Sequence, residues 1–485
     1  MKTDALKSPV RAADRTQAPA TAPRRDAPEK RLLCLSYRFP PETYPLVPRV
    51  KCFLERLRAS SWTVDAVTAA ERAAGGERLA VHRVQERSPT WLVEGMQRLR
   101  LGKLRDLLTW PDRFAFWIVP AFRKALQLVE EHRYDAIAAF MKPFSGGLAG
   151  VLVKRMTGLP LVLNLNDSPT CPDVHPTFPS WVHYRLARWL EDLFVREADA
   201  LVYLSRRSLE RVRARHPETL HDKFHLIRRG VRPLPPPAQS TDRTDDFRIV
   251  YTGGTSGWYR FQDDRPSSLP RQLYRAWQEL GRHEVAELDY RTHGPVYVGK
   301  AVQRLVERHP EWEGRVRVEV YGGRYPDDVE ARVLADHGLS EIVRLHDAVP
   351  HEEALRHMRA ADLLFMALPD RVDGTPGDRM SVKTYEYLMT DRPILAALPP
   401  GETRAYLRGK PGVHLTGPKD VADMTTVLET LAARRFGDVE EKEEEAAPLA
   451  VDRAALKPEL ADTRRARAFE DVLEGVCRSF SRSNA

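Results

Sequence analysis

The sequence predicts a protein of two tandem α/β domains, each of the doubly wound, Rossmann-like kind, with an interdomain cleft and a C-terminal helix. Three observations predict this fold class. The 485 residues exceed the roughly 250–300 that one hydrophobic core organises. Short apolar runs typical of buried parallel strands alternate with amphipathic helical stretches. A proline-rich polar stretch then divides this alternation into two series.

Changes in composition define the predicted domain boundaries. The first stretch is rich in Ala, Pro and charge without periodic apolar residues, which predicts a disordered leader. An acidic run near the C-terminal end is typical of a solvated loop. The predicted segments are a leader at 1–30, an N-terminal domain at 31–235, a linker at 236–246, a C-terminal domain at 247–435, and an acidic loop with a final helix at 436–485.

The first series predicts five strands and five helices. The strands are expected at Leu32–Tyr37, Thr63–Thr68, Ala136–Phe140, Leu161–Leu165 and Ala200–Leu204. The helices are expected at Val47–Ala59, Phe114–His132, Gly147–Met156, Trp181–Ala198 and Arg206–Arg215. In such sheets ligands bind at the carboxyl ends of the strands, so side chains that follow these runs are candidate site residues.

The second series repeats the pattern. Its strands are expected at Arg248–Thr252, Val316–Tyr321, Ile342–Leu345, Leu363–Ala367 and Pro393–Ala397. Its helices are expected at Leu269–Leu280, Lys300–Arg308, Val329–His337, Glu352–Ala360, Val382–Met389 and Val421–Ala433, and a last one at Ala461–Phe480.

Charge and composition limit the classes of partner. Residues 31–235 carry 33 basic and 21 acidic residues, within a chain of net charge +8. This excess indicates either a polyanionic neighbour, such as anionic lipid or a phosphate-bearing acceptor, or an arginine-rich soluble surface. No recognisable nucleic-acid readout motif accompanies it, so we expect no nucleic-acid partner.

The same composition bears on the compartment. No stretch approaches the roughly 18–20 uncharged apolar residues of a membrane-spanning helix, and residues 1–31 lack the apolar core of a signal peptide. The four cysteines are scattered without a CxxC pair, which predicts a reduced cytoplasmic setting with neither a disulfide framework nor a zinc site.

The segment from Asp373 to Leu388 carries the most informative motif. Its first part, Asp373-Gly-Thr-Pro-Gly-Asp378, predicts a loop, and a helix is expected to begin near Met380. A helix N-terminus presents free N–H groups to an anion, so a diphosphate fits there. Lys383 then lies where an ammonium meets phosphate, and Glu386 where a carboxylate accepts ribose hydroxyls. A surface Lys–Glu pair on an ordinary helix remains the alternative.

This segment resembles the donor-binding helix of retaining family-four glycosyltransferases, which reads K-L-F-E-Y-L before a P-I-L strand. Those enzymes often carry two acidic residues eight apart, and Asp378 and Glu386 have that spacing here. The resemblance implies that Glu386 holds the ribose and Asp378 touches sugar hydroxyls. It also implies the two-domain GT-B architecture of that family.

The N-terminal motif supports the same family. Ser36-Tyr-Arg-Phe-Pro-Pro-Glu42, followed by Arg49 in a predicted helix, resembles the family's Y-F-P-P-E … R signature. Glu42 and Arg49 are therefore candidate acceptor-binding residues, with a loop salt bridge as the alternative. Many relatives have a Gly-Gly pair in this loop, whereas this chain has Tyr44-Pro45.

Other matches indicate further site residues. Pro160-Leu-Val-Leu-Asn-Leu-Asn-Asp167 resembles the family's P-L-V-L-D-F-R-D strand, so Asp167 is a candidate acid or orienting group, or else a helix cap. Gly253 and Gly254 match the Y-x-G turn that opens the second domain, where glycine lets the backbone approach the donor. Gly322 is expected to line the base or sugar pocket, with a simple turn as the alternative, and Arg260 is expected to meet the diphosphate.

The resemblance implies a reaction as well. Sugar transfer from a nucleotide donor develops charge on the leaving diphosphate, and Lys383, Arg260 and the helix start are expected to stabilise it without a metal or other cofactor. The expected partners are a nucleotide sugar and a saccharide or polyprenyl-linked acceptor in surface polysaccharide assembly. An inactive glycosyltransferase-like scaffold and a sugar-nucleotide epimerase are the alternatives.

A second amphipathic segment bears on localisation. Trp91–Arg105 interleaves Arg and Lys with apolar residues and is predicted as one helix. It either lies on an anionic bilayer at the inner face of the plasma membrane, as a peripheral contact, or packs against its own domain.

Overall fold

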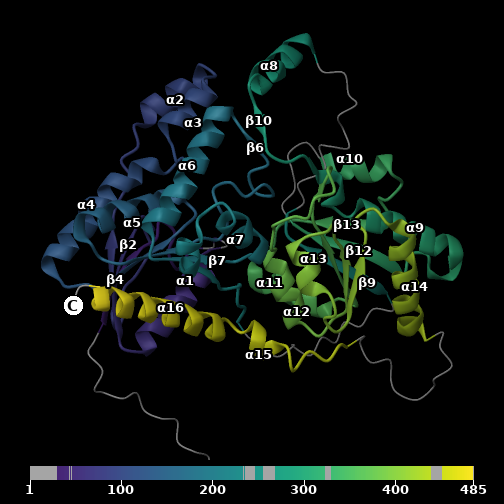
Figure 1. Ribbon diagram of the computed structural model, residues 1–485. Coiled ribbons are helices and arrows are strands. Elements are labelled where there is room, and N and C mark those ends of the chain that lie inside the picture. The colour runs from purple at the N-terminus through teal and green to yellow at the C-terminus, as the bar shows by residue number, and fades with distance from the viewer. Residues whose placement is uncertain are drawn as a thin grey trace, which may run out of the picture.

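A computed structural model of the protein describes residues 30–42, 44, 46–232, 234, 246–254, 268–322, 329–437 and 450–483. The predicted leader, most of the linker and the acidic run at 438–445 lie outside the described residues. Two parallel sheets, each covered by helices on both faces, stand next to each other along the chain (Figure 1). The predicted pair of Rossmann-like α/β domains is confirmed.

The N-terminal domain contains a seven-stranded sheet in the order β3-β2-β1-β4-β5-β7-β8, with every neighbouring pair parallel. The strands are β1 (Lys30–Leu35), β2 (Trp62–Thr68), β3 (Leu79–Arg83), β4 (Ala136–Phe140), β5 (Leu161–Asn164), β7 (Ala200–Tyr203) and β8 (Phe224–Leu226). The covering helices are α1 (Val47–Ala59), α4 (Ile118–Glu131), α5 (Phe144–Thr157), α6 (Trp181–Glu197) and α7 (Arg206–Arg213). β1, β4 and β5 are apolar throughout or nearly so because helices bury both faces of the sheet.

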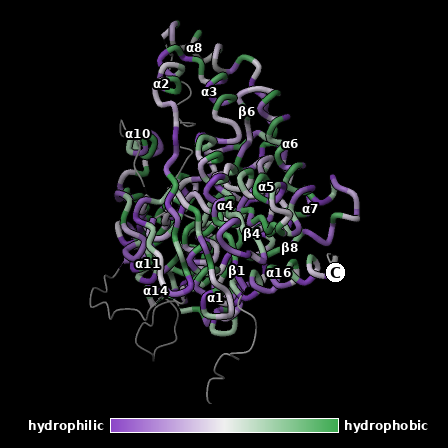
Figure 2. The backbone as a smooth tube through the Cα atoms, turned by 90° about the vertical axis from the view of Figure 1, so that its left-hand side faces the viewer, coloured by the Kyte–Doolittle hydropathy of each residue, from purple (hydrophilic) through white to green (hydrophobic). Residues whose placement is uncertain are grey.

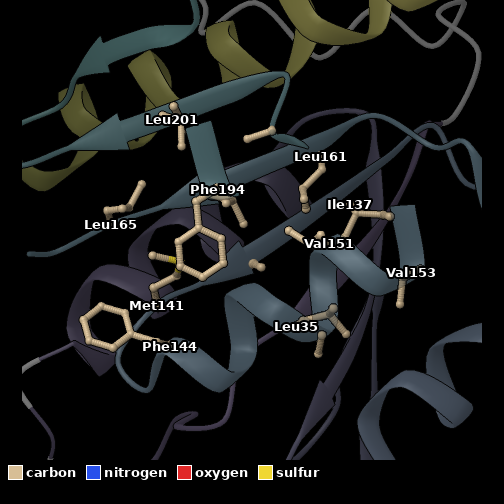
Figure 3. Packing of buried hydrophobic residues seen from close by; sticks show 14 of the residues in the cluster. Leu35, Ile137, Met141, Phe144, Val151, Val153, Leu161, Leu165, Phe194 and Leu201 are labelled. Carbon is tan, nitrogen blue, oxygen red and sulfur yellow. The ribbon is translucent and has the colours of Figure 1, made fainter. Parts of the chain in front are cut away.

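Close helix-to-sheet packing fills this core. Figure 3 shows Phe194 of α6 lying against Met141, which follows β4. A Cβ atom added at Gly147 of α5 would lie 2.3 Å from the Met141 sulfur, so only glycine fits there. Glycine at position 147 therefore lets α5 approach the sheet closely.

The C-terminal domain contains a six-stranded parallel sheet in the order β13-β12-β9-β14-β16-β17. The strands are β9 (Phe247–Thr252), β12 (Val316–Tyr321), β13 (Val343–His346), β14 (Leu363–Ala367), β16 (Ile394–Ala397) and β17 (Val413–Thr416). The helices are α8 (Leu269–Glu279), α9 (Val296–Arg308), α10 (Val329–Asp336), α11 (His351–Ala360), α12 (Val382–Met389), α13 (Glu402–Leu407) and α14 (Val421–Phe436).

Helix α15 (Lys457–Leu460) packs against α12 of the second domain, and the last helix, α16 (Asp462–Ser483), returns to the first domain. Figure 1 shows α16 running beneath the N-terminal sheet. The ring of Phe469 stacks on that of Phe53 in α1, with centroids 4.3 Å apart. Ala466, Phe469 and Leu473 are buried in the N-terminal core, so the end of the chain ties the two domains together.

The structure also contains two short antiparallel ribbons, one of which joins the domains. Strand β6 (Thr177–Phe178) pairs with β10 (His283–Glu284), whereas β11 (Leu288–Asp289) pairs with β15 (Asp370–Arg371) inside the second domain. Only the first of these ribbons crosses between domains among the described residues. Within the same described part of the chain, no helix is both long and apolar enough to span a membrane.

The prediction of a single helix over Trp91–Arg105 was wrong. The structure has two helices, α2 (Thr90–Arg98) and α3 (Gly102–Leu108). Arg100 adopts a positive φ of 57° between them, which no α-helix can continue through. The other predicted elements agree with the structure to within a few residues at their ends, although the sequence did not reveal β3, β8 or β17.

Candidate functional site

Glycine turns at the carboxyl ends of β9 and β12 form the floor of the candidate donor site. Gly253 has a φ of +104°, which favours glycine, and a Cβ added at Gly322 would lie 2.6 Å from the Gly253 carbonyl oxygen. The two turns therefore touch, and the predicted approach of Gly253, Gly254 and Gly322 to the donor stays a prediction. A Cβ at Gly253 would lie 3.5 Å from the Lys383 Nζ, which puts that ammonium beside the turn.

Lys383 lies in the first turn of α12. Its Nζ is buried with no hydrogen-bond partner in the described structure, and it lies 3.7 Å from the centroid of the Tyr251 ring. Burial, with a smaller contribution from the nearby Arg379 guanidinium, lowers the pKa of Lys383 to about 7, and the Glu386 carboxylate opposes that shift. The N-cap residue Ser381 makes no side-chain capping bond. An unpaired ammonium at an uncapped helix start is a site suited to an anion.

Glu386 lies one turn further along α12. Its side chain is 15% exposed, and one carboxylate oxygen lies 3.7 Å from the His351 Nε2. Arg229, which follows β8 in the other domain, is held at a lowered pKa by burial, and both Glu386 and Asp167 oppose that shift. A guanidinium therefore connects the two predicted carboxylates electrostatically across the domain boundary.

The sequence interpretation did not identify Arg229. Arg229 stands in the segment Ile227-Arg-Arg-Gly-Val231, which directly follows β8. Tandem arginines directly after a strand are the signal that was available, because strand ends meet at the cleft.

Asp378 lies at the domain interface, with 4% of its side chain exposed. Its Oδ2 accepts a hydrogen bond from the Arg211 Nε at 2.7 Å, and its Oδ1 lies 3.8 Å from the Arg207 Nε. Both arginines belong to α7 of the N-terminal domain. The predicted contact of Asp378 with sugar hydroxyls stays a prediction, and it requires Arg211 to be displaced.

Asp173, from the loop after β5, completes a group that we call the interdomain clasp (Asp173, Arg211, Arg371, Asp378). Arg371 donates to the Asp173 carboxylate at 2.7 Å, with side-chain exposures of 11% and 8%. The backbone N–H groups of Asp378 and Arg379 donate to the same carboxylate. The pocket beside the clasp has a volume of about 20 Å³, which holds little more than one water molecule.

Glu402 makes a second contact between the domains. Its carboxylate accepts the backbone N–H groups of Arg206 and Arg207, both at 3.2 Å, at the start of α7. Arg228 donates to it at 2.5 Å. A carboxylate at a helix N-terminus interacts favourably with the helix dipole, so Glu402 stabilises the closed arrangement of the domains.

The predicted acceptor residues make contacts within the N-terminal domain. Glu42 pairs with Arg38 at 3.4 Å, which is the loop salt bridge named as the alternative. Arg49 is buried and donates to Asn164 Oδ1 and to the carbonyls of Ile227 and Arg228. Burial lowers the pKa of Arg49 to about 9. These contacts show that Arg49 holds the ends of β5 and β8 together. The predicted diphosphate contact, Arg260, lies outside the described residues.

Asp167 follows β5 and pairs with Lys142, which follows β4. His175 lies further along the same loop as Asp167. It is near both charged residues, as their effects on its pKa show: Lys142 lowers this pKa and Asp167 opposes that shift. Burial is the main cause, and it lowers the pKa of His175 to about 4, so the ring is neutral at pH 7. Its Nε2 has no hydrogen-bond partner in the described structure.

His175 also lines a pocket of about 560 Å³ in the N-terminal domain. Apolar side chains, including Trp110, Phe144 and Phe178, form much of its wall, and Arg105 and Arg113 add positive charge. Pockets of this size and mixed character are typical of small-molecule sites. The sequence interpretation missed His175 because it lies eight residues beyond Asp167, in a loop whose path only the structure gives.

Comparisons with known proteins agree with this architecture. Residues 47–230 match the family model described as a glycosyl transferase 4-like domain. This match lies in the first domain and supports the resemblance drawn from the motifs to family-four glycosyltransferases, and the solved structures share the predicted two-domain fold. No curated protein matches the chain.

Solved structures share the fold across nearly the whole chain. The trehalose 6-phosphate synthase of Burkholderia multivorans has a TM-score of 0.58 at 13% identity, covering 95% of this chain and 99% of that one. HepE from Anabaena, solved with UDP and glucose, has a TM-score of 0.56 at 13% identity, covering 92% and 99%. The sucrose-phosphate synthase of Thermosynechococcus elongatus has a TM-score of 0.52 at 13% identity, covering 93% and 98%.

Proposed function

We propose that this glycosyltransferase moves a hexosyl group, with retention of configuration, from a nucleoside-diphosphate sugar to a saccharide or polyprenyl-linked acceptor in surface polysaccharide assembly. The observation that carries the proposal is the buried, unpaired ammonium of Lys383 beside the Gly253 turn and the start of α12. A diphosphate supplies the negative charge that this ammonium lacks.

The donor diphosphate lies between Lys383 and the uncapped start of α12 in this proposal. Charge that develops on the leaving diphosphate is then stabilised by a fixed ammonium and by N–H dipoles already pointing at it, without reorganisation. Glu386 accepts the ribose hydroxyls, and Arg229 orients its carboxylate. The chemistry asks for no metal, since side chains supply the positive charge.

The acceptor enters through the pocket lined by His175. The bond between the sugar C1 and the diphosphate oxygen breaks and its electron pair stays on that oxygen. A bond from C1 to the acceptor oxygen forms, and the proton of the acceptor hydroxyl passes to the departing diphosphate oxygen. The neutral Nε2 of His175 is free to form a hydrogen bond with the acceptor hydroxyl. This hydrogen bond orients the acceptor and transfers no proton. HepE, whose fold the chain shares, was solved with UDP and glucose, which supports a uridine nucleotide as the first donor to test.

A thermal-shift screen against UDP, GDP, ADP and their sugars tests the proposal. We expect one base to stabilise the protein, and Glu386→Ala to remove that stabilisation. Glu353→Ala, on the neighbouring helix α11, is the matched control and retains it. A protein that no nucleotide stabilises would contradict the donor site and favour the inactive scaffold.

A further inference from the structure

Four helices at one end of the molecule expose apolar side chains that nothing in the described structure covers. Figures 1 and 2 both show α2, α3 and α8 gathered at this end, above α6. We call this region the helical end surface and define it by Trp91 of α2, Leu101 and Leu104 beside and in α3, Trp181 of α6, and Leu273 and Trp277 of α8. Trp91 is 75% exposed, Leu273 is 64% and Trp277 is 61%.

The apolar residues of α8 lie on one face of that helix. Leu269, Leu273 and Trp277 are four residues apart, which places them above one another, and Leu280 follows at the helix end. Every described side chain of α8 is exposed, and α2 and α3 contain no buried residue. Amphipathic helices of a globular protein normally turn their apolar face to the core. The exposed apolar faces of these helices therefore indicate a binding surface for an apolar partner.

Both domains contribute to the helical end surface. The Lys103 ammonium of α3 donates a hydrogen bond to the Leu280 carbonyl at the end of α8. The β6–β10 ribbon pairs Phe178 with His283, and the Tyr184 ring lies 4.5 Å from the His283 ring. The C-terminal domain thus extends α8 across the boundary to lie beside the helices of the N-terminal domain.

Charge distinguishes the kind of partner. Residues 90–108, 181–189 and 268–282 together contain nine Lys and Arg but three Asp and Glu, interleaved with the exposed apolar residues. Protein interfaces are depleted in Lys and in charge at their core, whereas helices that lie on membranes combine an apolar face with basic residues that meet anionic headgroups. Val93, Gln97 and Arg105, on the same helices α2 and α3, line the 560 Å³ pocket, so the pocket lies beside this surface.

We propose that the helical end surface docks on an anionic lipid bilayer, with α3 and α8 both at headgroup depth, so that the membrane binds the two domains together. The proposal deepens the proposed function, because a lipid-linked acceptor then reaches the adjacent pocket from the membrane. It differs from a contact through Trp91–Arg105 alone, because α8 brings the other domain to the same plane.

Co-sedimentation of the full chain with phosphatidylcholine vesicles that contain phosphatidylglycerol tests this. Two double variants place charge on this surface. The first, Leu101→Glu with Leu104→Glu, alters the part at α3, and the second, Leu273→Glu with Trp277→Glu, alters the part at α8. Each is expected to lower partitioning about tenfold or more, because the lost apolar contacts are large. Met156→Glu is the matched control, since Met156 is 67% exposed on α5 outside this surface, and it binds as the unaltered chain does.

Removing phosphatidylglycerol or raising the salt concentration is expected to weaken binding, since surface charges are screened. An α8 variant that binds vesicles as tightly as the unaltered chain would overturn the two-domain surface. Absence of vesicle binding, with a concentration-dependent dimer that Trp277→Glu dissociates, would overturn the membrane and assign the surface to a second copy. Nucleotide binding in solution is measured separately, so vesicle binding without any nucleotide shift would contradict the proposed function alone.

Discussion

At the scale of single residues, Lys383 combines a cost to folding with a use in binding. Its ammonium is buried without a hydrogen-bond partner among the described residues, and the face of the Tyr251 ring and the nearby Glu386 carboxylate compensate it in part. A group held at a pKa of about 7 instead of 10.5 binds fewer protons in the folded chain than in the unfolded one across that window. The penalty is therefore full below pH 7 and fades as the pH rises toward 10.5.

Lys383→Met should accordingly stabilise the ligand-free protein. We expect the free energy of unfolding to rise by roughly 1–4 kcal/mol at pH 6, and by less at pH 9 where the lysine is already neutral. Chemical denaturation at the two pH values measures the difference. The same variant should lose about 100-fold in nucleotide-sugar affinity, because its charge partner for the diphosphate is gone. A destabilised variant with intact affinity would contradict both statements.

Donor affinity should depend on pH through the same group. A bound diphosphate favours the charged ammonium and raises its pKa, so the complex holds more protons than the free protein above pH 7. Affinity is then highest below pH 7 and falls by at most about tenfold per pH unit above it. A nucleotide sugar is the correct ligand, since its diphosphate lacks the terminal phosphate that titrates near pH 6. Lys383→Arg keeps its charge and should show no such fall.

His175 carries the prediction for the acceptor. His175→Gln keeps a polar side chain but loses the neutral ring nitrogen, and we expect kcat/KM for the acceptor to fall about tenfold, the value of one hydrogen bond. Donor affinity should stay unchanged. The matched control is His183→Gln, which also lines the pocket and whose ring nitrogens already bond Ser180 and the Lys103 carbonyl. Equal losses in the two variants would indicate damage to the pocket and not a specific hydrogen bond.

At the scale of elements, Glu402 shows how one helix start depends on the other domain. Its carboxylate takes two N–H groups of α7 and the Arg228 guanidinium. Glu402→Ala leaves these donors without that partner, so we expect a loss of about 2 kcal/mol in the free energy of unfolding. Glu353→Ala, a half-buried acid of α11 that pairs only within its own helix in the described structure, should lose less than about 0.5 kcal/mol. Denaturant melts of the two variants compare them directly.

Much of the element pattern could be predicted because it is local. The strands β4, β12 and β14 and the helices α1 and α12 begin and end at the predicted residues, since apolar periodicity and flanking prolines or glycines mark their ends. The β6–β10 ribbon and the return of α16 to α1 could not be predicted, because they depend on contacts between residues over 100 positions apart. The split of α2 from α3 depends on the single backbone conformation of Arg100.

The candidate site divides in the same way. Lys383, Glu386 and the glycines of β9 and β12 were predicted, since a motif and a strand end locate them. The partners of Asp378 were not, because Arg211 and Asp173 come from the other domain. Arg49 carried a motif match, yet only the structure shows it holding Asn164 and two carbonyls.

At the scale of the whole molecule, the interdomain clasp decides how closed the two domains are. Asp173→Ala removes the partner of Arg371 and of two backbone N–H groups, all from the second domain. Loss of a buried charge partner costs about 3–5 kcal/mol, so the domains should separate more readily. Small-angle scattering is expected to report a larger radius of gyration. Asp222→Ala, on the outer 3₁₀ turn before β8, should leave the radius unchanged.

The central claim is that Lys383 and Glu386 form a nucleotide-sugar site, and isothermal titration of UDP-glucose tests it most directly. The account predicts one site per chain in the unaltered protein, with binding lost in Glu386→Ala and in Lys383→Met while Lys300→Met, on α9, binds normally. If UDP-glucose fails, the nucleotide sugar selected by the thermal-shift screen is titrated in its place. Binding that survives in both site variants, or that Lys300→Met also abolishes, would contradict the claim.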